Sequence, residues 1–365
     1  MKVICDRGIL LDALNLAQAV VVSRTPKPVL LCIRLEAREG KLSVSATDLE
    51  AALHLVLDQV EVQEEGEVLV PANKLTPVVR ESVDPTITIE TDAEAAHIRG
   101  ADAHFKIFGH PASEFPPVPT FEGEADMEVK ASELVGLIQR TLFATARETS
   151  RYAINGVLVE VDGKKLTLVA TDGRRLALAR GNCTNVKGET QQAIIPSKAL
   201  NLLTRLIDDP DGKVRIRLAD NQAFFGTDRA TLTTNLVEGN FPPYKDVIPK
   251  DQDRRAVFNT TQLASAVRRA GLLTNEESKG VCFRFTDKQL ELSSRAPETG
   301  EAEVSVPLES YNGESIEIGF NPFFITDGLK VIDTDEVSVE LKAPNKPGLL
   351  RAGSDYQYVV MPVSL

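Results

Sequence analysis

The stretch VDGKKLTLVATD at residues 161–172 decides the fold, because it occurs twice more in altered form. An earlier copy, REGKLSVSATD, spans residues 38–48, and a fainter later copy, TDKQLELSSR, spans residues 286–295. The copies align at a leucine that returns every 124 residues: Leu42, Leu166 and Leu290. Solenoid repeats have periods of about 20 to 50 residues, so this much longer period predicts three whole domains, each with its own core.

Two further landmarks repeat at nearly the same spacing. VPANKL at residues 70–75 matches IPSKAL at 195–200, and GFNP at 319–322 holds the third place. The triplet FPP recurs at residues 115–117 and 241–243. The landmarks divide the 365 residues into predicted domains of residues 1–125, 126–250 and 251–365, which are ordinary domain sizes.

Composition places the chain among folded, water-exposed proteins. It is 42% hydrophobic and 26% charged, and no apolar run approaches the roughly 20 residues that a membrane-spanning helix needs. The first residues lack the apolar core of a signal peptide, so we expect a cytoplasmic protein without membrane contact. Four widely spaced cysteines show no metal-binding pattern, and we expect no metal and no cofactor.

Each domain is predicted to open with an amphipathic helix, continue through strands, add a second helix after the Pro landmark and finish with strands. The predicted helices are residues 8–22, 72–80, 131–147, 197–207, 260–274 and 322–332. Pro77 should cut or bend the second helix, and Thr260 should cap the fifth. Residues 157–161 and 166–170 should form a hairpin that turns at Asp162 and Gly163. Residues 116–126 and 244–253 are predicted linkers.

Charge is unevenly distributed. The six predicted helices, together with the residues beside them, carry a net charge of +7, although the whole chain carries -12, so the remainder carries -19. A basic helical surface on an acidic body would contact phosphates while the body repels polyanions. Helices also commonly carry Lys and Arg on solvated faces, so the pattern alone leaves both interpretations open.

The sequence carries no motif for chemistry. It lacks the glycine-rich phosphate loops, the HExxH zinc motif and the GxSxG nucleophile motif. Its four histidines lie in the first third, so a histidine site would be missing from the other repeats. Asp48 and Asp172 could serve as catalytic carboxylates of a hydrolase or transferase, but a Thr-Asp pair at a strand end is more typical of turn chemistry. A scaffold that binds only peptides is a second alternative.

Three motifs together resemble one family. They are RYAING at residues 151–156, ATDGRRLA at 170–177 and YVVMPVSL at 358–365. Their order and spacing, with the triple repeat, are similar to those of the bacterial sliding clamp, the beta subunit of DNA polymerase III. The resemblance implies an α+β fold of three clamp-type domains, each with two helices packed on antiparallel sheets. It also implies a head-to-tail homodimer that forms a six-domain ring around duplex DNA and has no catalytic residues.

The resemblance further implies a pocket in which the replicative polymerase, the clamp loader and other proteins with a clamp-binding motif dock a short peptide. The matching residues are Ile154, Thr171, Gly173, Arg174, Arg175, Leu176, Pro242, Val247, Val359, Val360, Met361 and Pro362. Apolar side chains of the motif YVVMPVSL at residues 358–365 would help to form an exposed apolar patch, and methionine adapts to varied partners. The sequence departs from the family pattern at Ala153, Arg174, Asp246 and Ser364, which bears on the motif that partners must carry.

Two other sets of residues follow from the same resemblance. Since the helices would form the inner wall of the ring, their cations are expected to face DNA: Arg24, Lys74, Arg80, Arg140, Arg147, Lys198, Arg205 and Arg268. The ring would close where the first domain of one copy meets the third domain of the other. The residues expected at this seam are Phe105, Ile107, Leu272 and Leu273.

Overall fold

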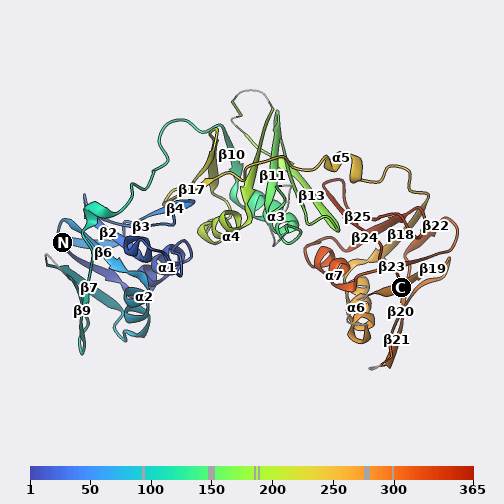
Figure 1. The fold of residues 1–365 in the computed structure, drawn as a ribbon, viewed down its shortest axis with the longest axis horizontal. Helices are drawn as coiled ribbons and strands as arrows, with labels where there is room; N and C mark the ends of the chain where they lie inside the picture. Colours follow the sequence, from blue (N-terminus) through green and yellow to red (C-terminus); the bar gives the residue numbers. More distant parts are fainter. Residues whose placement is uncertain (93–94, 147–152, 185, 188–189, 275–279, 298–299) are drawn as a thin grey trace. The chain divides into compact units, whose positions relative to one another are not determined.

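A computed structural model describes the whole chain except residues 93–94, 147–152, 185, 188–189, 275–279 and 298–299. The chain divides into two compact units, which are considered separately (Figure 1). Unit 1 comprises Met1–Ser132, Thr184–Gly188 and Lys198–Leu236. Unit 2 comprises Glu133–Cys183, Glu189–Ser197 and Val237–Leu365.

Unit 1 contains two antiparallel sheets. One has the strand order β5-β1-β7-β8-β9, and the other has the order β10-β15-β16-β17-β4-β3-β2-β6. The second sheet is continuous across strands from the first and middle thirds of the chain. The strands are β1 (Lys2–Asp6), β2 (Cys32–Arg38), β3 (Lys41–Thr47), β4 (Ala51–Leu57), β5 (Val60–Glu64), β6 (Gly66–Pro71), β7 (Thr86–Thr91), β8 (Ala95–Arg99), β9 (His104–Phe108), β10 (Met127–Lys130), β15 (Lys213–Leu218), β16 (Gln222–Gly226) and β17 (Ala230–Asn235).

Unit 2 repeats this plan with the middle and last thirds of the chain. Its sheets have the orders β14-β11-β12-β13-β26-β25-β24-β18-β22 and β21-β20-β19-β23. The strands are β11 (Gly156–Asp162), β12 (Lys165–Thr171), β13 (Arg175–Asn182), β14 (Gln191–Pro196), β18 (Arg254–Asn259), β19 (Val281–Phe285), β20 (Gln289–Ala296), β21 (Gly300–Pro307), β22 (Ser310–Asn312), β23 (Ile316–Phe320), β24 (Glu336–Leu341), β25 (Gly348–Ala352) and β26 (Tyr356–Val360).

The six predicted helices are present, each ending within a few residues of its expected bounds or continuing as a short 3-10 turn. The helices are α1 (Arg7–Gln18), α2 (Ala72–Glu81), α3 (Ala131–Leu142), α4 (Ser197–Leu206), α5 (Tyr244–Val247), α6 (Thr260–Ala270) and α7 (Pro322–Lys330), with 3-10 turns η1 (Pro28–Leu31), η2 (Ala112–Glu114) and η3 (Gly271–Leu273). Figure 1 shows α1 beside α2 and α6 beside α7, and the two members of each pair pack together.

The predicted cut at Pro77 and the predicted cap at Thr260 were both wrong. Helix α2 does not end at Pro77, because buried Leu75, Thr76 and Val79 anchor it on both sides of the exposed proline. The cap of α6 is Asn259, whose side chain accepts a 3.1 Å hydrogen bond from the Gln262 N–H. Thr260 is the first helical residue instead, and its hydroxyl donates to the Thr334 carbonyl. Tertiary packing therefore overrides the local signal at both places.

The predicted hairpin is present with its turn shifted by one residue. Asp162 pairs with Lys165, so the turn residues are Gly163 and Lys164, and Gly163 has a φ of +57°. In the first repeat, Glu39 and Gly40 form the turn with φ values of +52° and +72°. Two positive φ values are typical of a type I′ turn, and one at the first position is typical of type II′. The two hairpins thus keep one register with different turns.

The predicted linker at residues 244–253 begins with the short helix α5. Tyr244 opens α5 and is buried in an apolar cluster with Leu158, Leu176 and Val359.

Three of the cysteines are buried. Burial raises the pKa of Cys32 to about 11, and burial together with the nearby Asp6 raises the pKa of Cys5 to about 12. These two thiols are therefore chemically inert near neutral pH. In the described residues, no helix is long and apolar enough to cross a membrane.

Candidate functional site

The predicted docking residues gather in unit 2 where β13 meets β26. The two strands pair antiparallel, with Arg175 opposite Val360 and Leu176 opposite Val359. Beyond the last paired residues, the Met361 N–H donates a 2.9 Å hydrogen bond to the Arg174 carbonyl. Two segments that lie far apart in the sequence are thereby held as one continuous surface, which we call the β13–β26 junction.

A tight turn shapes the start of β13. The Thr171 hydroxyl donates to the Arg175 carbonyl at 2.7 Å and accepts from the Gly173 N–H at 3.1 Å. The Asp172 carboxylate accepts from the N–H groups of Arg174 and Arg175. Gly173 has a φ of +87°, a conformation that favours glycine. The interpretation of Thr-Asp as turn chemistry is confirmed: Oδ1 of Asp172 is engaged by the backbone, and Oδ2 accepts a 3.0 Å hydrogen bond from Nε of Arg175.

The equivalent turn in unit 1 confirms this interpretation for Asp48. Its carboxylate accepts from the N–H groups of Glu50 and Ala51, at 3.0 and 2.7 Å. It also forms a 2.6 Å ion pair with Lys198 on α4. Among the described residues, no group of three or more His, Cys, Asp or Glu side chains could hold a metal ion.

Arg175 is the most constrained charged side chain of the β13–β26 junction. Its side chain is 11% exposed and forms ion pairs with Asp172 at 3.0 Å and Asp327 at 2.8 Å. The guanidinium also donates to the Phe143 carbonyl and lies over the rings of Phe143 and Phe324. Burial lowers the pKa of Arg175, but Tyr358, Asp327 and Asp172 raise it by more, so the charge is retained.

No pattern in the sequence indicates the partners of Arg175. Asp327 lies 152 residues away and Phe143 lies 32 residues away, so no local spacing could reveal them. The doubled arginine in the motif ATDGRRLA was the only available signal, and it does not say which arginine is buried. Through its ion pair with Asp327, Arg175 links β13 to α7. The same residue pairs with Val360 of β26, so α7 and β26 are both tied to the start of β13.

The predicted docking residues divide into a buried floor and an exposed rim. Leu176, Val359, Val360 and Ile154 are buried. Met361 and Val247 are 39% and 42% exposed. The remaining predicted residues are part of the turn (Thr171, Gly173, Arg174 and Arg175) or are half-buried prolines (Pro242 and Pro362). The floor therefore presents little surface of its own, and the rim supplies the accessible apolar contacts.

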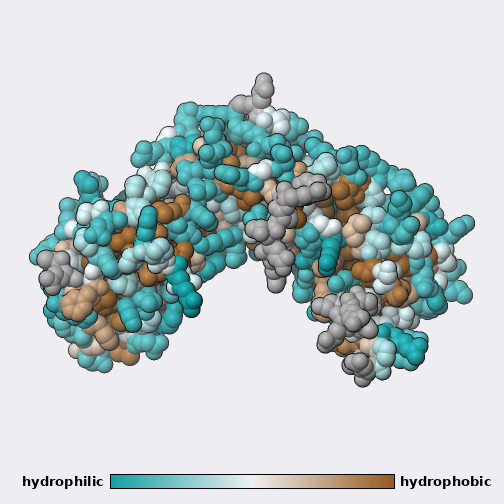
Figure 2. Space-filling model, viewed as in Figure 1, coloured by the Kyte–Doolittle hydropathy of each residue, from teal (hydrophilic) through white to brown (hydrophobic). Residues whose placement is uncertain are grey.

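Large exposed apolar side chains mark where partners could contact the protein. Figure 2 shows hydrophilic residues over much of the visible face, with apolar patches between them. Within the described part of the chain, the large exposed apolar residues are Leu49, Val83, Phe105, Phe108, Val247, Leu272, Phe323, Met361 and Leu365. Four of them coincide with predictions from the sequence: Val247, Met361, Phe105 and Leu272.

The predicted DNA-facing cations differ in how they are held. Arg24, Lys74, Arg205 and Arg268 are exposed and form no ion pair with any described residue. Arg140 forms a two-oxygen ion pair with Asp333, and Lys198 is paired with Asp48. Arg80 is exposed and donates to the Asn15 side chain at 3.0 Å. Arg147 lies outside the described residues.

The predicted seam residues lie in both units. In unit 1, Phe105 and Ile107 belong to β9, which forms one edge of its five-stranded sheet. Phe105 is exposed, whereas Ile107 is buried against its own sheet. In unit 2, Leu272 and Leu273 form the turn after α6, where Leu272 is 78% exposed and Leu273 is half-buried. Phe105 and Leu272 are thus the accessible members.

Repeated α+β domains joined through shared antiparallel sheets define a clamp-type protein. Three family models match the chain in order: the N-terminal domain of the DNA polymerase III beta subunit at residues 1–119, the central domain at 128–243 and the C-terminal domain at 245–364. The chain therefore belongs to the DNA polymerase III beta subunit family.

Individual relatives agree with this assignment over their whole length. The chain is 36% identical to the beta sliding clamp of Pseudomonas putida, covering 99% of both chains, and 30% identical to that of Escherichia coli K12, covering 100% of both. A crystal structure of a sliding clamp from Pseudomonas aeruginosa bound to griselimycin matches with a TM-score of 0.93 at 34% identity, covering 100% of both chains. The protein is a DNA sliding clamp for processive replication, and its family acts as a processivity factor rather than a catalyst.

Proposed function

We propose that two copies of this chain close head to tail into a six-domain ring around duplex DNA, and that replication proteins dock on it through short peptides. The observation that carries the proposal is the similarity to sliding clamps across all three domains. A ring that holds DNA by enclosure needs no base contacts, and weak phosphate contacts along its lining let it slide.

Docking is proposed at the β13–β26 junction. Exposed Met361 is held at the end of β26 by its hydrogen bond to Arg174, and exposed Val247 precedes Ile248, which packs on the floor residues Leu176 and Val359. This combination suits an apolar peptide anchor. The proposed binding partners are the replicative polymerase, the clamp loader and other proteins with a clamp-binding motif. Ala153 is a buried member of the floor cluster, so its small side chain bears on which anchor fits best.

DNA contact is proposed for the eight cations named above, with unequal shares. Arg24, Lys74, Arg205 and Arg268 are exposed and unpaired among the described residues, so their charge is available to phosphates. Arg140 and Lys198 already neutralise carboxylates, and a phosphate would have to compete with Asp333 and Asp48. We therefore expect charge reversal at Arg205 to slow loading onto DNA more than neutralising Lys198.

Ring closure is proposed at β9 and the turn after α6. The edge strand β9 offers unpaired backbone groups, and Phe105 and Leu272 offer apolar side chains. Leu272→Asp should place a charge in an apolar interface and give a folded monomer at micromolar concentration. Val83→Asp is the matched control, because Val83 is a similarly exposed apolar residue at 77%. Light scattering should give about twice the 39.7 kDa chain mass for the control. A Leu272→Asp dimer would place the seam elsewhere.

We further propose the limits of the three domains, the absence of catalysis and the cellular location. We place the domain boundaries after residues 125 and 250. The protein has no catalytic residues of its own, which is supported by the engagement of Asp48 and Asp172 in backbone turns. Its site of action is the cytoplasm, where replication takes place in bacteria.

The enclosure itself is tested on closed circular DNA. A loaded ring should stay on a nicked circle at high salt, although salt weakens phosphate contacts steeply, and should leave once the DNA is linearised. The measurement is the amount of bound protein before and after linearisation at two salt concentrations. Removal by salt alone, with no effect of linearisation, would show an ordinary surface ligand instead of a ring.

A further inference from the structure

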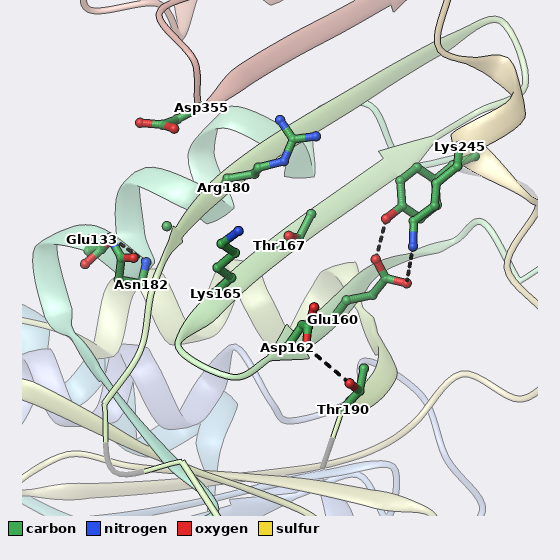
Figure 3. A pocket seen from close by; sticks show the side chains of 12 residues that line it. Glu133, Glu160, Asp162, Lys165, Thr167, Arg180, Asn182, Thr190, Lys245 and Asp355 are labelled. Carbon is green, nitrogen blue, oxygen red and sulfur yellow. Dashed lines mark hydrogen bonds and ion pairs between the residues drawn. The ribbon is translucent and has the colours of Figure 1, made fainter.

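A polar cavity of about 500 Å³ lies on unit 2, at the far ends of β11, β12 and β13 from the turn at Gly173 (Figure 3). None of the residues assigned above to docking, DNA contact or ring closure lines it. The side chains that matter for the argument are Glu160, Lys165, Arg180 and Tyr244. All of the residues that line the cavity belong to unit 2.

The cavity and the docking floor share one face of one sheet. Along a strand, alternate residues lie on the same face, so Leu176, Leu178 and Arg180 of β13 do so. The register places Arg180 opposite Thr167, and Lys165 opposite Asn182, on that face. The sheet face is therefore apolar near Leu176 and polar near Arg180. Tyr244 of α5 packs on the apolar part and also lines the cavity.

Two cations in the cavity have no acidic partner in the part of the chain that the structure describes. Among the described residues, neither Lys165 nor Arg180 forms an ion pair, and Arg180 makes only a long 3.5 Å hydrogen bond from its side chain to the Ser354 carbonyl. As diagonal neighbours on adjacent strands, their long side chains can reach a common point. Figure 3 shows both side chains projecting into the same cavity.

All four carboxylates around the cavity are already engaged, and one of them, Asp355, accepts a 2.8 Å hydrogen bond from the Ser354 hydroxyl. Glu160 accepts from the Tyr244 hydroxyl and is 3.8 Å from Lys245. Burial and this carboxylate raise the pKa of Tyr244, so the hydroxyl remains a donor. Asp162 accepts from Thr190, and Glu133 accepts from the Asn182 N–H. These acids make the cavity a poor site for a polyanion, whereas a single carboxylate between Lys165 and Arg180 meets complementary charge.

We infer that Lys165 and Arg180 form a subsite for an acidic side chain of the same partner segment whose apolar part occupies the β13–β26 junction. The inference rests on the proposed docking function. Leu176 and Arg180 are four residues apart on β13, a distance of about 13 Å at strand rise. An extended segment would cover this distance with about four residues, so the acidic side chain should follow or precede the apolar anchor by that spacing.

The test uses synthetic peptides that contain the polymerase's clamp-binding segment. Each peptide carries a Glu or a Gln four residues away from the segment, either before it (one orientation) or after it (the other orientation). The Glu peptide of one orientation should bind wild-type protein about two- to fivefold more tightly than its Gln match, and the difference should shrink with salt. Lys165→Gln with Arg180→Gln should remove the difference. Lys41→Gln should keep it, because Lys41 holds the place of Lys165 in the first repeat and lies in unit 1.

The two proposals fail in different ways. If Glu and Gln peptides bind equally in both orientations while Met361→Ala weakens all of them, the acidic subsite is wrong and the docking site stands. If Met361→Ala leaves all affinities unchanged, the docking site itself is wrong. If the Glu peptide keeps its advantage in the double variant, the carboxylate binds elsewhere and the assignment of Lys165 and Arg180 is overturned.

Discussion

The β13–β26 junction has a counterpart in unit 1, where β4 meets β17, and the two share a backbone but not a surface. The Asn235 N–H donates to the Glu50 carbonyl at 2.8 Å, as Met361 donates to Arg174 at 2.9 Å. The Thr47 hydroxyl donates to the Ala51 carbonyl, as Thr171 does to that of Arg175. The fold therefore builds the same frame twice.

The side chains on this frame differ at almost every place. Where β26 and its continuation carry Val359, Val360 and Met361, the β4–β17 junction carries Thr233, Thr234 and Asn235. The half-buried Arg175 is replaced by Ala51, and Gly173 by Leu49. The frame therefore belongs to the fold, whereas the docking proposal rests on apolar residues that the β13–β26 junction has and the β4–β17 junction lacks.

Removing the half-buried Arg175 cation should have the largest effect. Arg175→Met leaves Asp172 and Asp327, which are 20% and 34% exposed, without their shared partner, and should cost about 3 kcal/mol, the lower end of the cost of breaking a buried pair. The matched change at the β4–β17 junction, Lys198→Met, should cost about 1 kcal/mol or less, because the Lys198 side chain is 54% exposed. Urea unfolding measures both. Equal losses would mean that the two ionic links are equivalent.

The next effect concerns peptide binding. Met361→Ala removes an accessible apolar contact at the rim and should weaken polymerase-derived peptides by about 2 kcal/mol, roughly 30-fold. Asn235→Ala, at the matching place in unit 1, should leave affinity unchanged. Isothermal titration calorimetry separates the two. An equal loss in both variants would show that the β4–β17 junction also takes part in docking.

A smaller effect is expected from the turn residue. Gly173 has a φ of +87°, and a Cβ added there would meet nothing within 4 Å. Gly173→Ala should therefore cost only backbone strain, about 1–2 kcal/mol. Leu49 already carries that strain at a φ of +76°, so Leu49→Gly should be neutral or stabilising. Thermal unfolding of both variants checks this, and a destabilised Leu49→Gly protein would show that the Leu49 side chain contributes contacts of its own.

The smallest effect tests the polar floor of the β4–β17 junction. The buried Thr233 hydroxyl has no hydrogen-bond partner among the described residues, whereas Val359 takes this place in unit 2. Thr233→Val should stabilise unit 1 by about 1 kcal/mol. Thr231→Val is the control and should destabilise, because the Thr231 hydroxyl accepts from the Phe121 N–H at 3.1 Å. If Thr233→Val also destabilises, an unseen partner holds its hydroxyl.

Features that repeat along the chain could be predicted from the sequence, and features that join distant segments could not. The repeat of Leu42, Leu166 and Leu290 predicted whole domains, and helical spacing placed the six helices nearly correctly. The Thr-Asp turns were predicted because their hydrogen bonds are local. The resemblance of the motifs led to the residues of the β13–β26 junction.

The missed features all depend on tertiary contacts. The link from Arg175 to Asp327, the pairing of Lys198 with Asp48 and the continuation of α2 through Pro77 each depend on what lies beside a residue in space. The polar cavity was missed for the same reason, since Lys165 and Arg180 converge only when β12 and β13 pair. Strand pairing fixes such neighbours, and residue spacing along the chain carries no record of it.

The pairing of β13 with β26 also governs the order in which the protein can be assembled during synthesis. Arg175 finds its partner in Val360, 185 residues later, so β13 has a bare edge while the intervening chain is translated. The strand β4 likewise has a bare edge until β17 has been synthesised. Bare strand edges recruit other chains, and pairings this distant form slowly. Each of the first two domains is thus completed by the final strand of the next, and a chain interrupted between domains leaves the ribosome with an open, aggregation-prone edge.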